Sequence, residues 1–232
     1  MELGGNAPFI VFEDADIDAA VEGALISKYR NSGQTCVCTN RILVQESIHD
    51  AFVAKLVAAT ADLKMGNGLE DGVQQGPLVN AGAVQDVDQL VQLSVEAGAQ
   101  VALGGARSEL GPCYYQPTVL TAITPDMAVF RHEIFGPVAP VMSFTDEAEA
   151  ISLANDTEFG LASYFYTRDI GRVWRVSEAL DYGMVGVNEG IISNEMAPFG
   201  GVKASGSGRE GSKYGIDDYL EIKYILMGGL DR

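Results

Sequence analysis

Hydrophobic positions along this chain alternate between helical and strand-like spacing. Between residues 14 and 30 they recur every three or four positions, which predicts an amphipathic helix. Asp14 or Asp16 can cap the start of this helix, and Lys28 and Arg30 place positive charge at its end. The segment 41–45 that follows is mostly apolar and predicts a buried strand.

The same alternation continues through most of the chain. Further helices are predicted at 48–63, 83–97, 146–155 and 170–180. Further strands are predicted at 100–103, 114–123, 137–144, 161–167 and 184–188. Such an alternation favours an α/β fold with a largely parallel, twisted sheet flanked by helices.

The C-terminal part has a different character. Residues 198–211 are rich in glycine, a short helix is predicted at 213–218, and the apolar segment 219–227 predicts a final strand. An unpaired apolar strand is an edge that needs covering. We expect this strand to pair with another chain; completion of the chain's own sheet is the alternative. The predicted organisation is a main domain at 1–205 and a C-terminal segment at 206–232.

Composition and charge narrow the classes of function. Of the 232 residues, 47% are hydrophobic, which permits a packed core. Fifteen basic residues against 32 acidic ones give a net charge of −17, so the basic footprint of a nucleic-acid-binding protein is missing. An anionic substrate would need a local cation, because the overall field opposes it.

The cysteine count and the termini bear on the cellular compartment. Three cysteines do not suggest a secreted disulfide scaffold, and no apolar run approaches the ~20 residues of a membrane span. The first residues lack the features of a signal peptide. We therefore expect a cytoplasmic location and no membrane partner.

Cys36 is the first residue with candidate chemistry. It lies in a polar loop between the first predicted helix and the strand at 41–45, where a substrate can reach it. We expect nearby donors and cations to favour its thiolate. Taken alone, however, a cysteine in such a loop is more often structural than nucleophilic.

Two further motifs contain glutamates. Glu2 precedes two glycines that allow the backbone to approach a ligand closely, and its carboxylate can serve as a general base. Glu133 can accept hydrogen bonds from sugar hydroxyls, and Phe135 can pack on a flat ring. Each motif has an ordinary alternative: a turn with a solvated carboxylate for the first, and a Gly-Pro turn for the second.

The order of these motifs is more specific than any one of them. Glu-Leu-Gly-Gly begins at Glu2, Gly-Gln-Thr-Cys ends at Cys36, Glu-Ile-Phe-Gly-Pro begins at Glu133, and Pro-Phe-Gly-Gly-Val-Lys-Ala-Ser-Gly occupies 198–206. This arrangement resembles the aldehyde dehydrogenase superfamily over essentially the whole chain. The resemblance implies the fold of that family's catalytic domain for 1–205 and an oligomerisation strand within 206–232.

The resemblance also implies roles for matching positions. Cys36 is expected to attack the aldehyde as the nucleophile, and Glu2 to activate the water that hydrolyses the resulting thioester. Glu133 and Phe135, with Leu3 and Gly4, are expected to contact NAD or NADP. The backbone N–H of Cys36 would be one oxyanion donor. The family's second donor, an Asn side chain, is expected upstream together with the NAD(P)-binding domain, so we expect this chain alone not to oxidise aldehydes.

A narrower resemblance concerns the substrate. The segments 29–38, 191–193 and 208–216 resemble succinate-semialdehyde dehydrogenases. In that subfamily the residues matching Arg30 and Ser193 bind the remote carboxylate of the substrate, and Phe199 is expected to form a wall of the aldehyde pocket. A guanidinium can hold a carboxylate through two hydrogen bonds. The alternative for Arg30 is a surface cation at a helix end.

Three functional alternatives follow from these resemblances. The first is NAD(P)-dependent oxidation of succinic semialdehyde to succinate. The second is the same reaction on another semialdehyde, such as glutarate semialdehyde. The third is a non-catalytic assembly module that retains the fold.

Two other patterns have weaker interpretations. Residues 206–211 match G-x-G-x-x-G, but they do not directly follow a predicted strand, so we reject a dinucleotide site there. Cys36 and Cys38 have no histidine at ligand spacing, and we expect no metal. Cys38 is instead a candidate partner of Cys36 in a reversible, inactivating disulfide. The alternative for Cys38 is a small buried hydrophobic residue.

Overall fold

The structure is a computed structural model that describes residues 1–231. Seven strands form one sheet in the order β3-β4-β5-β2-β1-β7-β8. These strands are β1 (Ala7–Val11), β2 (Thr39–Gln45), β3 (Gln100–Leu103), β4 (Thr118–Thr121), β5 (Val138–Phe144), β7 (Ala162–Tyr166) and β8 (Met184–Val187). All neighbours run parallel except β3 and β4. The predicted α/β fold with a largely parallel sheet is therefore confirmed.

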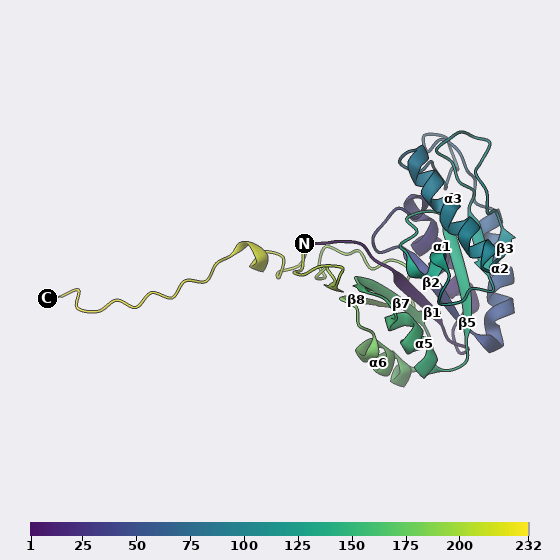
Figure 1. The fold of residues 1–232 in the computed structure, drawn as a ribbon. Coiled ribbons are helices and arrows are strands. Elements are labelled where there is room, and N and C mark those ends of the chain that lie inside the picture. The colour runs from purple at the N-terminus through teal and green to yellow at the C-terminus, as the bar shows by residue number, and fades with distance from the viewer. Residues whose placement is uncertain (232) are drawn as a thin grey trace.

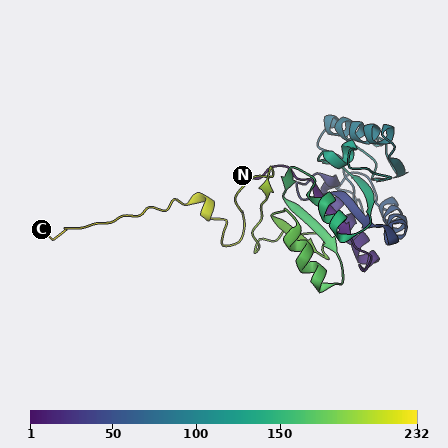
Figure 2. The same cartoon turned by 60° about the horizontal axis from the view of Figure 1, so that its bottom comes forward.

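Helices cover both faces of this sheet (Figures 1 and 2). They are α1 (Ile17–Tyr29), α2 (His49–Ala61), α3 (Ala81–Glu96), α4 (Ala128–Arg131), α5 (Glu147–Asn155) and α6 (Ile170–Ala179). Successive side chains of a strand point to opposite faces. Phe9 and Val11 accordingly pack in one core with α1 and α2, whereas Ile10 packs in a second core with α3, α5 and α6. The sheet is thus the middle of three layers.

The central strand β1 is an element that the sequence pattern did not predict. All five of its residues are buried, and its neighbours β2 and β7 pair with it on either side. A parallel strand covered on both faces shows no polar alternation. Its five apolar residues follow two glycines and precede an acidic segment, so the short run carries no periodic signal.

Helix α1 begins and ends at identifiable residues. The side chain of Asp16 accepts hydrogen bonds from the N–H groups of Asp18 and Ala19, so Asp16 rather than Asp14 is the N-cap. The helix ends at Tyr29, and Asn31 and Ser32 then adopt left-handed backbone angles in the 3₁₀ turn Arg30–Gly33. This reversal directs the chain back toward the start of β2 and forms the loop that carries Cys36.

The C-terminal part differs from its prediction in two respects. The helix expected at 213–218 is wrong, because only the 3₁₀ turn Asp217–Tyr219 forms. Residues on either side of this turn are exposed, and a helix this short is unstable in water without packing. Residues 220–229 are extended, exposed and outside any ladder within residues 1–231, and they run away from the body (Figure 1). The alternative of completing the chain's own sheet is therefore not supported, and pairing with another chain stays a prediction.

Two short features complete the description. Strand β6 (Phe159–Gly160) pairs antiparallel with β9 (Val202–Lys203), and this brings the glycine-rich segment beside β7. A further 3₁₀ turn, Glu46–Ile48, precedes α2. Among the helices of residues 1–231, none is both long and apolar enough to cross a membrane.

Candidate active site

The candidate catalytic residues gather at one edge of the sheet. Glu2 precedes β1, Cys36 precedes β2, and Glu133 precedes β5. Because these three strands are parallel, their amino ends lie at the same edge. Open parallel sheets more often bind ligands at the carboxyl ends of their strands. The fold therefore brings together three motifs that are up to 131 positions apart, counting from Glu2 to Glu133.

Glycines allow the three loops to touch. A Cβ on Gly5 would lie 2.3 Å from the carbonyl oxygen of Cys36, and a Cβ on Gly4 would lie 2.7 Å from Oε2 of Glu133. Gly33 has φ +76°, and a Cβ there would lie 2.1 Å from the carbonyl oxygen of Gly136. Real Cβ atoms do not approach backbone atoms this closely, so Gly5 and Gly33 require glycine, whereas a side chain at Gly4 would displace the carboxylate of Glu133.

The Cys36 thiol is half-buried and lies in an acidic environment. Burial raises its pKa, and the negative charges of Glu133 and Glu2 raise it further, while the N–H groups of Cys36 and Val37 oppose this shift. The expectation of a favoured thiolate is therefore wrong for this arrangement of the chain. Backbone donors are present as expected, but burial and two carboxylates outweigh them.

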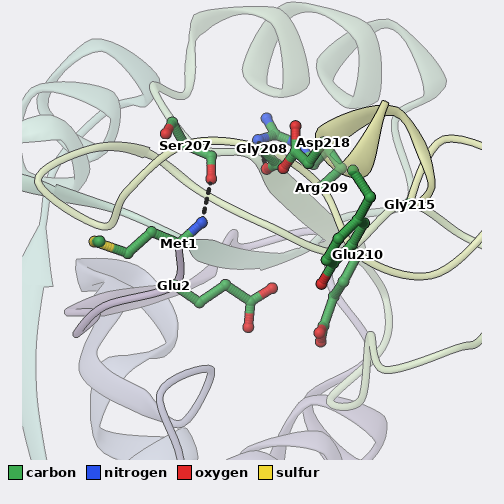
Figure 3. A pocket seen from close by; sticks show the side chains of 9 residues that line it. Met1, Glu2, Ser207, Gly208, Arg209, Glu210, Gly215 and Asp218 are labelled. Carbon is green, nitrogen blue, oxygen red and sulfur yellow. Dashed lines mark hydrogen bonds between the residues drawn. The ribbon is translucent and has the colours of Figure 1, made fainter. Parts of the chain in front are cut away.

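Glu2 lines a cleft of about 270 Å³ together with Glu210 (Figure 3). Cys36 does not line this cleft. Burial and the charge of Glu210 both raise the pKa of Glu2. A carboxylate with a raised pKa is a better general base near neutral pH. Sequence reasoning missed Glu210, although it lies within a segment that carries the family resemblance.

Removing the charge of Glu210 should lower the pKa of Glu2. A general base must be ionised, so Glu210→Gln should move the acid limb of the kcat profile to lower pH. Steady-state rates of the intact protein between pH 5 and 9 would measure this shift. Glu178→Gln, which changes an exposed carboxylate of α6, serves as the control. An acid limb that stays in place in Glu210→Gln would show that Glu210 does not act on the base.

Glu133 is suited to accept hydrogen bonds from a ligand. Its Oε1 accepts from the backbone N–H of Gly5 at 3.0 Å, and Oε2 faces the bare Cα of Gly4. Burial raises the pKa of Glu133, and the Gly5 N–H and the charge of Lys28 oppose this. Phe135 is 43% exposed and has φ 52°, which is strained for a bulky residue. A half-buried carboxylate beside an exposed ring fits a ribose and a flat heterocycle.

Lys28 is a buried cation beside the candidate site. It is fully buried, and its Nζ makes no hydrogen bond within the described chain, residues 1–231. Its positive charge lowers the pKa values of Glu133 and Cys38. Lys28 lies in the last turn of α1, as predicted, and there it is a buried counter-charge to Glu133.

Ser205 anchors the N-terminal motif to the glycine-rich segment and was also missed. Its carbonyl oxygen accepts from the N–H of Leu3 at 3.0 Å, and its hydroxyl donates to the carbonyl oxygen of Gly4 at 2.7 Å. The same hydroxyl accepts from the N–H of Gly160 at 2.9 Å. The side chain of Leu3 is 49% exposed beside this anchor.

The predicted substrate residues are placed separately. Ser193 and Phe199 together line a second cleft, separate from the one that Glu2 lines. The backbone of Phe199 pairs with that of Glu210. Arg30 is exposed at the end of α1 and makes no side-chain hydrogen bond or ion pair with residues 1–231. No hydrogen bond joins Arg30 to Ser193 among residues 1–231, so their shared role stays a prediction.

Cys38 is buried, and its thiol donates to the carbonyl oxygens of Lys28 at 3.5 Å and of Thr39 at 3.3 Å. Burial raises its pKa. Both cysteines are free thiols in this structure. This burial favours the interpretation as a small core residue, while disulfide formation with Cys36 remains a prediction.

The structure bears on the G-x-G-x-x-G match and on the possibility of a metal site. The segment 206–211 follows the two-residue strand β9. Between it and residue 231 the only helical element is the 3₁₀ turn Asp217–Tyr219, so the strand–turn–helix setting of a dinucleotide site is missing there. Among these residues no group of three or more His, Cys, Asp or Glu is arranged to hold a metal.

Comparison with known proteins places this fold and site in a defined class. The family model described as "Aldehyde dehydrogenase family" matches residues 1–225. The chain belongs to the aldehyde dehydrogenase family. It is 63% identical to a glutarate-semialdehyde dehydrogenase of Pseudomonas aeruginosa over 99% of this chain and 48% of that protein. It is 60% identical to a mitochondrial succinate-semialdehyde dehydrogenase of Oryza sativa, covering 100% of this chain and 44% of that protein.

A solved structure agrees with these relatives. The crystal structure of an NADP-dependent enzyme of Escherichia coli has a TM-score of 0.96 and 59% identity, covering 98% of this chain and 47% of that one. The chain therefore spans about half the length of the relatives that it matches. Its close homologues include dehydrogenases of both semialdehydes that the sequence pattern suggested.

Proposed function

We propose that this chain forms the catalytic, thiol-bearing part of an NAD(P)-dependent aldehyde dehydrogenase. The observation that supports this most is the meeting of Cys36, Glu2 and Glu133 at the amino ends of three parallel strands. The charges of both glutamates raise the pKa of the Cys36 thiol, so the three groups are near enough to interact electrostatically. A nucleophile, a base and a ribose acceptor are the parts that this chemistry needs.

The proposed chemistry divides between two side chains. The Cys36 thiol gives its proton to water, and the resulting thiolate Sγ adds to the aldehyde carbon, while the Cys36 N–H stabilises the oxyanion of the thiohemiacetal. Loss of hydride from this adduct leaves a thioester on Cys36. Glu2 then takes a proton from water, whose oxygen attacks the thioester carbon, and the carboxylic acid product leaves as Cys36 regains its proton.

A nicotinamide dinucleotide, when bound, accepts the hydride. Glu133 would hold the ribose hydroxyls through its carboxylate, and Phe135 would pack beside the ring, with Leu3 and Gly4 lining the approach. The Gly5 N–H fixes one oxygen of Glu133 and leaves the other to face the ligand. The proposed dinucleotide is NAD or NADP, and one similar structure is described as NADP-dependent.

The proposed substrate is a semialdehyde with a remote carboxylate. Succinic semialdehyde is the first candidate, and glutarate semialdehyde is the second, because relatives at 60% and 63% identity carry these names. Arg30 is an exposed guanidinium six residues before Cys36, and Ser193 lines a cleft with Phe199. These residues would bind the carboxylate and form the wall of the aldehyde pocket.

Arg30→Gln tests the proposed substrate class. In the intact protein, KM for succinic semialdehyde should rise about 10- to 100-fold, as expected for the loss of a charge-assisted pair. KM for butanal, which has the same carbon chain and no carboxylate, should stay within about twofold. Equal rises for both aldehydes would remove Arg30 from carboxylate binding. Comparing wild-type kcat/KM for succinic and glutaric semialdehydes decides between the two candidates.

The exposed C-terminal segment supports assembly with further copies of the chain. Between Tyr219 and Met227 the exposed apolar side chains include Ile222 and Tyr224, at 100% and 81% exposure. An extended apolar segment of this kind is suited to adding a strand to another sheet. A homo-oligomer, either a dimer or a tetramer, is therefore part of the proposal.

A further inference from the structure

Asn40 holds the main chain on both sides of Glu133. Its Nδ2 donates to the carbonyl oxygen of His132 at 2.8 Å, and its Oδ1 accepts from the N–H of Ile134 at 3.0 Å. The residue before Glu133 and the residue after it are thus held by one carboxamide. Asn40 is 3% exposed and is the second residue of β2, four residues after Cys36.

The same carboxamide is tied to the N-terminal motif. Its second Nδ2 hydrogen is donated to Oδ1 of Asn6 at 2.6 Å, and Nδ2 of Asn6 donates to the carbonyl oxygen of Phe130 at 3.1 Å. Asn6 is itself fixed by Arg41, whose Nη2 donates to its carbonyl oxygen at 2.9 Å. Asn6 directly follows Gly5, whose N–H binds Oε1 of Glu133. The contacts form a closed circuit that returns to Glu133.

We propose that Asn40 is a positioning residue for Glu133. It holds the main chain around Glu133 in a fixed position relative to the Gly-Gly motif and to Cys36. This inference rests on the proposed function for the role of Glu133 as ribose acceptor, but its geometric part does not. Only a carboxamide can donate twice and accept once in this position. A carboxylate cannot donate, and an apolar side chain would leave the His132 carbonyl and the Ile134 N–H unpaired.

The proposal makes a chemical prediction that needs no aldehyde activity. The charge of Glu133 raises the pKa of the Cys36 thiol, so Glu133→Gln should shift the pH profile of Cys36 alkylation by iodoacetamide to lower pH. If Asn40 places that charge, Asn40→Leu should shift the profile in the same direction. The double variant Asn40→Leu/Glu133→Gln should then lie on the profile of Glu133→Gln alone.

Mass spectrometry of the intact protein would follow the reaction at Cys36. The tryptic peptide 31–41 contains both Cys36 and Cys38, and fragment ions separate the two. Asn155→Leu is the matched control, because Asn155 also donates to a carbonyl, that of Ala179, and accepts from the N–H of Asp181. This control should lower Tm by about 5 °C, as Asn40→Leu should, and leave the alkylation profile unchanged.

If Asn40→Leu does not fold, a milder variant at the same position tests the proposal. Asn40→Ser keeps a polar side chain and room for water, and it should produce a smaller shift in the same direction. A purely structural Asn40 would lower Tm and leave the profile at that of wild type, and this outcome would overturn the proposal. Additive shifts in the double variant would overturn it as well.

A kinetic measurement links the placement to function. In the intact enzyme, Asn40→Ser should raise KM for the dinucleotide about tenfold, with a smaller change in kcat. The reason is that the contact with the ribose is weakened equally in the ground state and in the transition state. Absence of aldehyde oxidation in the wild type would reject the proposed function and leave the alkylation test of Asn40 intact. An unchanged KM together with an unchanged alkylation profile would reject the positioning role.

Discussion

Cys36→Ala should abolish aldehyde oxidation by the intact protein, with a fall in kcat of at least about 10³-fold. Removing a covalent nucleophile commonly costs more than this, because the remaining groups cannot form the adduct. The substitution should leave the fold intact, since the side chain is half-buried and the loop is held through its backbone. Formation of NAD(P)H at saturating succinic semialdehyde would measure the loss.

Cys113→Ala provides the matched control for this experiment. Cys113 is also a half-buried free cysteine, and it lies far along the chain, after β3. Its removal should change kcat by less than about twofold. Retention of more than a tenth of the wild-type kcat in Cys36→Ala would exclude Cys36 as the nucleophile and would favour a non-catalytic module that retains the fold.

Glu2→Gln should separate the two halves of the proposed reaction. The hydride-forming half does not use Glu2, so rapid mixing should show a burst of about one NAD(P)H per site. Turnover after the burst should fall by roughly 10²- to 10⁴-fold, because hydrolysis of the thioester lacks its base. Loss of the negative charge of Glu2 also lowers the pKa of the Cys36 thiol, which favours the first half.

A trapped thioester would identify the slow step directly. Intact-protein mass spectrometry of Glu2→Gln after the burst should show the mass of the acyl group on the chain, and digestion should locate it at Cys36. Glu178→Gln, on the exposed face of α6, should show neither the burst nor the adduct. A burst that disappears together with turnover would assign Glu2 to a step before the thioester.

Much of the fold follows from local patterns. The spacing in α1 and α3, the cap at Asp16 and the exact bounds of β3 agree with prediction because amphipathic periodicity and capping are local properties. Strand β1 was missed because burial on both faces removes the alternation that marks a strand. The short helix at 213–218 was predicted from local pattern, and it fails because it has no surface to pack on.

The electrostatics of the site could not be predicted from residue types. A cysteine in a polar loop suggested a favoured thiolate, but the fold buries the thiol and places Glu2 and Glu133 near it. Lys28 lies in the last turn of α1, as predicted, but its full burial could not be predicted from that position. A pKa depends on burial and on distant charges, and neither is a local property.

The sequence by itself determined the alternation of helices and strands, the ordered motifs around Glu2, Cys36 and Glu133, and the family that they indicate. Only the tertiary structure decided that these motifs meet at the amino ends of β1, β2 and β5, and that Glu210, Ser205 and Asn40 support them. The physical reason is the range of the interactions. Periodicity and capping act within a few residues, whereas parallel strand pairing, close glycine contacts and buried hydrogen bonds join segments that are distant along the chain, by 128 positions for Gly5 and Glu133.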